Sequence, residues 1–248
     1  MTITIDDKPC VCEPGEYLLQ IAARNGITIP TLCHHDGLPG QASCRVCIVE
    51  VEAGGRRSIV TACVYPVEAE CKVFTNSESV SAQRRMILAL LRSLAPDSNE
   101  VARLCEEYDV PTFDRFVTNP AGGKCILCGA CVRACESLGT GAICTAKRGV
   151  LKTVTTPYDE PSFACVGCAS CAAVCPTGSI EVTEADGQRR IWGKSLPLAA
   201  CKGCGTVMGT RMELWRATMK AGAKDVPELC ESCRKRAIAD VMAATYGR

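Results

Sequence analysis

The stretch Cys125–Cys135 reads CILCGACVRAC, and the stretch Cys165–Pro176 reads CVGCASCAAVCP. Both follow the spacing C-x2-C-x2-C-x3-C, which is typical of chains that bind two [4Fe–4S] clusters. In that arrangement, three cysteines of one stretch and the last cysteine of the other hold each cluster. One cluster is expected to take Cys125, Cys128, Cys131 and Cys175, and the other Cys165, Cys168, Cys171 and Cys135. The chain is therefore expected to carry electrons.

The composition limits the class of protein and its surroundings. The 248 residues include 21 cysteines, carry a net charge of +1 and contain only 4% aromatic residues. The near-neutral charge gives no reason to expect binding to nucleic acid or to an anionic membrane. The N-terminal segment lacks the apolar core of a signal peptide, and no apolar stretch reaches the roughly 18 residues that span a bilayer. We expect a cytoplasmic protein without membrane insertion, whose cysteines bind metal rather than one another.

Few aromatic residues and many cysteines indicate several small modules, each stabilised by a metal centre. Residues 1–77 show the order strand, strand, helix, cysteine-bearing loop and hairpin, with Gly26 ending the helix and Gly54-Gly55 forming the turn. Residues 78–110 show helical periodicity. We therefore expect an α+β multidomain chain: a β-grasp [2Fe–2S] ferredoxin domain at 1–77, a helical linker at 78–112, a bacterial-type two-[4Fe–4S] ferredoxin domain at 113–190 and a zinc-ribbon-like four-cysteine module at 191–248.

Four further cysteines precede the two stretches with a different spacing. Cys33, Cys44, Cys47 and Cys63 form C-x10-C-x2-C-x15-C. Plant-type [2Fe–2S] sites use C-x4-C-x2-C with a distant fourth ligand, so the first gap here is wider than in that pattern. The only two histidines, His34 and His35, follow Cys33 directly and are expected to lie near the cluster. The spacing predicts one [2Fe–2S] cluster on these four cysteines.

The segments PTLCHHDGL at 30–38 and SCRVCIVEV at 43–51 resemble the N-terminal part of the large iron–sulfur subunit of respiratory complex I. They equally resemble the small diaphorase subunit of NAD-reducing hydrogenases and the matching part of NAD-linked formate dehydrogenases. The resemblance covers about residues 1–185 and implies an electron-transfer role. That family usually carries an H-x3-C-x2-C-x5-C cluster at the position of 93–115, where this chain has no histidine and only Cys105. We expect three clusters in 1–185, with electrons passing directly between the [2Fe–2S] and [4Fe–4S] centres or through a partner.

A third group of cysteines lies near the C-terminus. Cys201, Cys204, Cys230 and Cys233 form two C-x2-C pairs, a pattern typical of tetrahedral structural zinc. A third [4Fe–4S] cluster is the alternative, although cubane sites more often use the three-cysteine loop found twice upstream. Between the pairs, a helix is expected to build a small core from Met212, Leu214, Trp215, Thr218 and Met219.

The remaining residues point to no chemistry beyond electron transfer. The cysteines outside the three groups are expected to be small buried apolar side chains: Cys10, Cys12, Cys71, Cys105 and Cys144. No glycine-rich dinucleotide motif, P-loop or nucleophile with a base is present. No catalytic residues are therefore expected, and flavin and NAD(P) are expected on another chain.

Together, these features predict the function. We expect an iron–sulfur electron-transfer subunit of a soluble, hetero-oligomeric oxidoreductase. It would relay electrons between a flavin- and NAD(P)-binding subunit and a second catalytic subunit, such as a hydrogenase or a formate dehydrogenase. The alternative is a stand-alone soluble carrier with several clusters.

Overall fold

The computed structural model describes residues 1–247 and divides into two compact units. Unit 1 consists of Met1–Arg133 and Val174–Ser179, and unit 2 consists of Ala134–Ala173 and the chain from Ile180 onward. The division cuts through both cysteine stretches, so that Cys175 belongs to unit 1 and Cys135 to unit 2.

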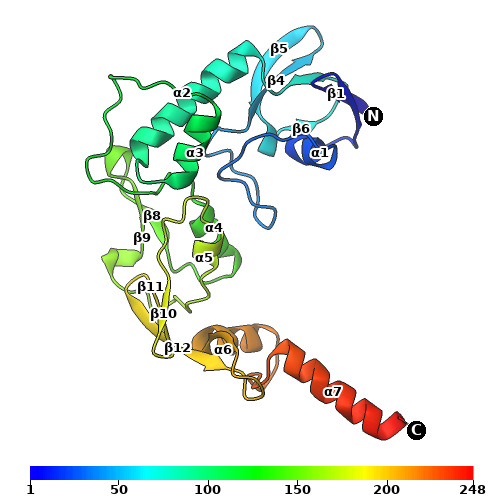
Figure 1. Ribbon diagram of the computed structural model, residues 1–248, viewed down its shortest axis with the longest axis vertical. Coiled ribbons are helices and arrows are strands. Elements are labelled where there is room, and N and C mark those ends of the chain that lie inside the picture. Colours follow the sequence, from blue (N-terminus) through cyan, green and yellow to red (C-terminus); the bar gives the residue numbers. More distant parts are fainter. Residues whose placement is uncertain (248) are drawn as a thin grey trace. The chain divides into compact units, whose positions relative to one another are not determined.

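The core of unit 1 is a five-stranded mixed sheet with the strand order β2-β1-β7-β4-β5. Figure 1 labels β1, β4 and β5 of this sheet. Strands β1 and β7 are parallel, and the other neighbouring pairs are antiparallel. A separate two-stranded sheet pairs β3 with β6. The strands are β1 (Thr2–Ile5), β2 (Lys8–Val11), β3 (Glu16–Tyr17), β4 (Ile48–Ala53), β5 (Arg56–Thr61), β6 (Pro66–Val67) and β7 (Lys72–Phe74).

Alternating side chains bury one face of this sheet against helix α1 (Leu18–Arg24). Ile3 and Ile5 of β1 are fully buried, as the period-two pattern of a strand requires. Leu18 and Ile21 of α1 enter the same core and gain stabilisation from removal of apolar surface from water. Helix α1 ends before Gly26, whose φ of +70° suits glycine. The predicted order of elements in 1–77 is therefore observed.

Two helices follow the sheet, α2 (Glu78–Leu94) and α3 (Asn99–Glu107), and they pack against each other. Ser77 caps α2 and Ser98 caps α3, because each hydroxyl accepts a hydrogen bond from a backbone N–H of the first turn. The helical structure predicted for 78–110 is confirmed.

Unit 2 contains a four-stranded antiparallel sheet with the order β10-β11-β12-β13 and a separate hairpin of β8 and β9. Helix α6 packs on β12 and β13. Helix α4 lies across the division between the units. The elements are α4 (Ala130–Ser137), β8 (Cys144–Ala146), β9 (Thr153–Thr155), α5 (Ser170–Ala173), β10 (Thr183–Ala185), β11 (Gln188–Ile191), β12 (Lys194–Ala200), β13 (Val207–Thr210), α6 (Arg211–Lys220) and α7 (Glu231–Tyr246), with short 3-10 turns at Ala62–Val64, Gly149–Leu151 and Pro157–Asp159.

Two expectations for this half of the chain are wrong. Cys144 is exposed rather than buried, because β8 and β9 form a two-stranded hairpin with no further strand beside it. Trp215 and Met219 are 56% and 45% exposed, so they build no core. Helix α6 instead buries Thr218 on the side that faces the sheet.

Candidate iron–sulfur and metal sites

The four cysteines assigned to the [2Fe–2S] cluster are buried and lie close together in unit 1. The backbone N–H of Cys44 donates to Cys33 Sγ at 3.4 Å, and Cys47 Sγ lies 3.4 Å from Cys63 Sγ. The thiol of Cys44 and nearby backbone N–H groups stabilise the Cys33 thiolate and lower its pKa to about 5. A thiolate with N–H donors around it is the ligand that iron requires.

A buried arginine fixes the loop that carries two of these ligands. Arg84 of α2 is fully buried, and it donates to the carbonyls of Val46 at 3.1 Å and Ile48 at 2.6 Å, on either side of Cys47. A third bond reaches the Thr75 carbonyl at 3.1 Å. Burial lowers the pKa of Arg84, and these carbonyls compensate for the water that its guanidinium has lost. Helix α2 thereby holds the cysteine loop in place.

A second arginine joins the [2Fe–2S] loop to the first [4Fe–4S] stretch within unit 1. Arg133 lies two residues after Cys131 in the sequence. Its guanidinium donates to the Cys33 carbonyl at 3.1 Å and to the Pro39 carbonyl. The charge of Arg133 also contributes to the low pKa of Cys33. The two cluster-binding segments are therefore hydrogen-bonded to each other.

The two C-x2-C-x2-C-x3-C stretches have equivalent backbones. The residues before and after the second cysteine have positive φ in both: Leu127 at 54° and Gly129 at 72° in the first, Gly167 at 72° and Ala169 at 60° in the second. Successive turns of this kind direct backbone N–H groups into one concavity. The Leu127 N–H donates to Cys125 Sγ at 3.4 Å, and the Gly167 N–H similarly bonds to Cys165.

The first set of expected cubane ligands, defined as Cys125, Cys128, Cys131 and Cys175, lies wholly in unit 1. Burial raises the pKa of Cys128 and raises that of Cys131 to about 12, with further contributions from the charges of Cys125 and Cys175. The backbone N–H of Ser179 donates to Cys175 Sγ at 3.3 Å. Burial disfavours ionisation of these thiols, yet the sulfur of Cys175 accepts a hydrogen bond from a backbone N–H. Both features fit a site in which a bound cluster replaces the thiol protons.

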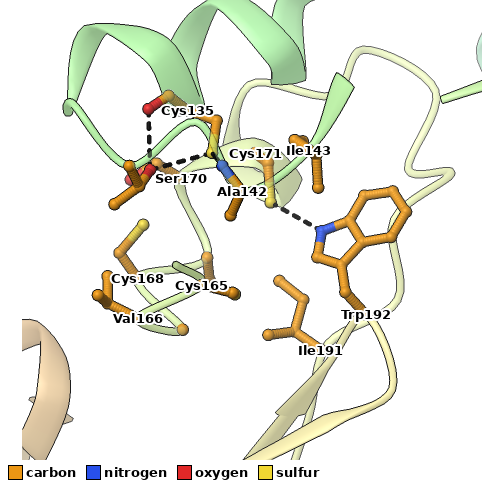
Figure 2. A pocket seen from close by; sticks show the side chains of 13 residues that line it. Cys135, Ala142, Ile143, Cys165, Val166, Cys168, Ser170, Cys171, Ile191 and Trp192 are labelled. Carbon is orange, nitrogen blue, oxygen red and sulfur yellow. Dashed lines mark hydrogen bonds between the residues drawn. The ribbon is translucent and has the colours of Figure 1, made fainter. Parts of the chain in front are cut away.

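The second set, defined as Cys135, Cys165, Cys168 and Cys171, lies wholly in unit 2 and lines one small apolar cavity, drawn in Figure 2. Cys135 Sγ accepts from the Ala142 N–H at 3.2 Å and lies 3.0 Å from the Thr140 hydroxyl. Burial raises the pKa of Cys165 and Cys171. Each set therefore combines cysteines of both stretches and lies within a single compact unit.

A lysine of the unit 2 sheet holds the loop of the second stretch. The ammonium group of Lys194, at the start of β12, donates to the carbonyls of Ser162 at 3.1 Å, Phe163 at 3.1 Å and Cys165 at 2.7 Å. These three hydrogen bonds from one ammonium group hold the segment that leads into the cysteine loop.

The same sheet packs closely on the loop around Gly167. A Cβ at Gly167 would approach Leu196 Cδ1 to 2.8 Å and Thr210 Cγ2 to 2.9 Å, and its φ of +72° also favours glycine. The Thr210 hydroxyl donates to the Val166 carbonyl, and Arg189 donates to the Gly167 carbonyl at 2.6 Å. The second cysteine loop therefore rests on β11, β12 and β13.

One side chain of this region donates directly to a ligand sulfur. Trp192 Nε1 lies 3.4 Å from Cys171 Sγ, and Figure 2 shows the indole edge directed at that sulfur. This hydrogen bond lowers the pKa of Cys171 against the opposing effect of burial.

The C-terminal cysteines form a much tighter group. The sulfurs of Cys201, Cys204, Cys230 and Cys233 all lie within 4.8 Å of one another. The first pair occupies the turn between β12 and β13, and the second pair begins α7, with Cys230 as its N-cap. Backbone N–H groups, with that of Cys230 first, lower the pKa of Cys201 to about 6. The group therefore offers four sulfur ligands to a metal ion. The lowered pKa of Cys201 favours its thiolate form.

Several residues of these sites are not apparent from spacing alone. Arg84, Arg133, Trp192 and Lys194 act from outside the cysteine motifs, through contacts that depend on the folded chain. The only signal in the sequence is Gly193, which marks a turn between two alternating segments and says nothing of the contact that Trp192 makes.

Two protein families match this chain. The family described as a 2Fe-2S iron-sulfur cluster binding domain matches residues 1–78. The 4Fe-4S dicluster domain matches residues 124–179. The chain therefore contains a 2Fe-2S domain followed by a 4Fe-4S dicluster domain and a C-terminal four-cysteine site.

Three curated relatives are subunits of nicotinamide-linked or quinone-linked oxidoreductases. The NADP-reducing hydrogenase subunit HndD of Solidesulfovibrio fructosivorans is 33% identical over 74% of this chain and 36% of its own length. A subunit of the NADH-quinone oxidoreductase of Rhizobium meliloti is 30% identical over 82% of this chain and 26% of its own length. The alpha chain of the NADPH-Fe(3+) oxidoreductase of Geobacter sulfurreducens is 30% identical over 83% of this chain and 27% of its own length. The chain thus spans about a quarter to a third of these relatives.

A solved structure has the same fold over most of the chain. One chain of a crystal structure of NAD+-reducing [NiFe]-hydrogenase in the H2-reduced state superposes with a TM-score of 0.60. It is 27% identical, and the match covers 72% of this chain and 85% of that chain. Within residues 1–247, no helix has the length and hydrophobicity needed to cross a membrane. The protein is an iron–sulfur chain homologous to subunits of hydrogenase, NADH-quinone oxidoreductase and NADPH oxidoreductase complexes.

Proposed function

We propose that this chain is a non-catalytic electron-transfer subunit of a multi-subunit oxidoreductase. It relays single electrons between a flavin- and NAD(P)-binding subunit and a second catalytic subunit, such as a hydrogenase or a formate dehydrogenase. The names of the relatives support the nicotinamide side, because NADP, NADH and NADPH each appear among them.

The observation that carries this proposal is the link between the [2Fe–2S] loop and the first [4Fe–4S] stretch. Arg133 donates to the Cys33 carbonyl at 3.1 Å, so a direct hydrogen bond joins the segments that carry the two ligand groups. Between them, residues 93–115 contain no histidine and only Cys105, whose buried thiol contacts the Leu88 carbonyl. We infer that electrons pass directly between these two centres, without an intermediate cluster.

The proposed ligand sets follow the crossed pattern. A β-grasp domain holds one [2Fe–2S] cluster on Cys33, Cys44, Cys47 and Cys63. The first and second sets hold one [4Fe–4S] cluster each, and the division of the chain into units supports the exchange of Cys175 and Cys135 between the stretches. When bound, the clusters accept and release one electron at a time. The chain supplies buried thiolates and N–H donors that fix each cluster and adjust its potential.

We infer that the C-terminal site holds zinc. Tetrahedral Zn–S bonds of about 2.3 Å place sulfurs about 3.8 Å apart, and Cys204 Sγ lies 3.7 Å from Cys230 Sγ. Four thiolates on the four irons of a cubane have to lie farther apart than four thiolates on a single ion. The separations within 4.8 Å therefore favour one ion.

The test uses the complex purified anaerobically through a tag on this chain. Cys47→Ser is expected to remove the [2Fe–2S] EPR signal and to abolish reduction of the cubanes by NAD(P)H, while dithionite still reduces them. Cys144→Ser, at an exposed cysteine, is the matched control and is expected to change neither. Purification of the chain alone, with no flavoprotein, would support the stand-alone carrier instead. Unchanged NAD(P)H-dependent reduction in Cys47→Ser would show that electrons enter elsewhere.

A further inference from the structure

We propose that Trp192 is a positioning residue for the second [4Fe–4S] cluster, and that its indole N–H makes this cluster the higher-potential cubane of the two. The inference rests on the proposed electron-transfer function, and it concerns the order of potentials within the chain. The hydrogen bond from Trp192 Nε1 to Cys171 Sγ at 3.4 Å is its starting point. The indole nitrogen can only donate, so the ligand sulfur is the acceptor.

The backbone at Trp192 adopts a conformation that is unfavourable for a bulky residue. Ile191 pairs with Lys194 across a two-residue turn, in which Trp192 has a φ of +52° and Gly193 a φ of +70°. Two positive φ values define a type I′ turn, which favours asparagine, aspartate or glycine at its first position. A bulky residue in the left-handed region is strained, because its Cβ crowds the following carbonyl oxygen. Such an outlier beside a cluster-binding cavity points to a role for the side chain that is held there.

The fourth cysteines of the two ligand sets make matching contacts, so the tryptophan is the difference among the side-chain N–H donors to sulfur. Cys175 accepts from a backbone N–H four residues later at 3.3 Å and lies 3.7 Å from the Thr177 hydroxyl. Cys135 likewise accepts from a backbone N–H at 3.2 Å and lies 3.0 Å from the Thr140 hydroxyl. In the first set, Cys131 occupies the position equivalent to Cys171. Among residues 1–247, Trp192 is the only residue whose side-chain N–H donates to a sulfur of either cubane set, and Cys131 receives no such bond.

The sign of the effect follows from charge. Reduction adds one electron to the cluster and its ligand sulfurs, while no bond breaks and no proton moves. A donor N–H stabilises the more negative, reduced form more than the oxidised form, so it raises the reduction potential. The electron, supplied by another cluster of this chain, therefore favours the second cubane over the first.

The test is a mediated redox titration of the full chain, followed by EPR, for Trp192→Phe. Phenylalanine keeps an aromatic ring and removes the donor. If the bond is stronger to the reduced than to the oxidised cluster by about 1 kcal/mol, of the order of one hydrogen bond, its loss lowers the equilibrium constant for reduction about fivefold, which corresponds to about 40 mV at 59 mV per tenfold. We expect one cubane to shift to lower potential by this amount, while the other cubane and the [2Fe–2S] cluster stay unchanged. An unchanged cubane potential, or an equal shift of both cubanes, would overturn the proposal.

The chain offers a matched control, because its only other tryptophan, Trp215, lies exposed on α6. Trp215→Phe is expected to leave all three potentials unchanged. It also leaves Trp192 as the sole tryptophan, so isotopic labelling of indole nitrogen then reports on this residue alone. We expect pulsed EPR of the reduced cluster in Trp215→Phe to detect hyperfine coupling to that nitrogen. Absence of the coupling would contradict the proposal even if Trp192→Phe fails to retain its cluster.

These readouts need no partner subunit. A failure to isolate a complex would therefore overturn the proposed function and leave the order of potentials standing. The reverse result, an intact complex with an unshifted cubane, would overturn only the role of Trp192.

Discussion

The two cysteine stretches have the same spacing, the same turns and matching backbone donors, but their surroundings differ. The first is joined by Arg133 to the [2Fe–2S] loop. The second rests on the sheet of β11, β12 and β13, through Lys194 and Trp192. The difference suggests a division of roles: the cysteine spacing is typical of one kind of cluster, whereas we propose that residues outside the motif set how easily the bound cluster is reduced.

The largest expected effect comes from removing the fourth cysteine of each stretch, which is proposed to bind the cluster of the other stretch. Cys175→Ala should remove the cubane of the first stretch, although Cys175 lies in the second stretch, and Cys135→Ala should remove the other. Each variant is expected to lose about four of ten irons per chain. Iron analysis and EPR measure the loss, with the exposed Cys144→Ser as control.

The identity of the lost cluster decides the outcome of that experiment. Adding Trp192→Phe to Cys175→Ala should still shift the surviving cubane, whereas adding it to Cys135→Ala should shift nothing. The opposite pattern would mean that each stretch keeps its own fourth cysteine, and the crossed sets would be wrong.

A smaller effect is expected from the C-terminal site. Cys204→Ser should release about one zinc per chain and loosen the turn between β12 and β13. Because Lys194 and Thr210 of these strands hold the second stretch, iron release from the second cubane to a chelator should accelerate several-fold. These contacts reach Ser162, Phe163, Cys165 and Val166 and not Cys175, so the release rate of the first cubane is expected to stay unchanged. Equal acceleration of both would show that the zinc module stabilises the chain generally.

The smallest effect is expected at the lysine itself. Lys194→Met removes three hydrogen bonds to carbonyls and leaves partly buried acceptors unpaired, which should cost about 1–3 kcal/mol of stability. Chemical denaturation measures this cost, and the chelator assay should report faster loss of the second cubane only. Lys152→Met, at an exposed lysine of the same unit, serves as the control. A loss of stability as large in Lys152→Met would contradict the role of Lys194.

The sequence predicts the cysteine groups and the order of elements in 1–110, because ligand spacing and apolar periodicity are local properties. It does not predict Trp192 or Lys194, whose partners lie about 20 to 30 residues away and are reached only through the register of β11 and β12. It also misplaces Cys144 and Trp215, since apolar character alone does not show which face of a hairpin or helix remains uncovered.

We propose above all that this chain binds one [2Fe–2S] cluster, two [4Fe–4S] clusters and a separate zinc ion. Metal analysis of the anaerobically purified full chain, with Mössbauer spectroscopy to assign the iron, tests this claim most directly. The account predicts about ten irons and one zinc per chain. About fourteen irons without zinc would contradict it, because the four C-terminal cysteines would then hold a third cubane.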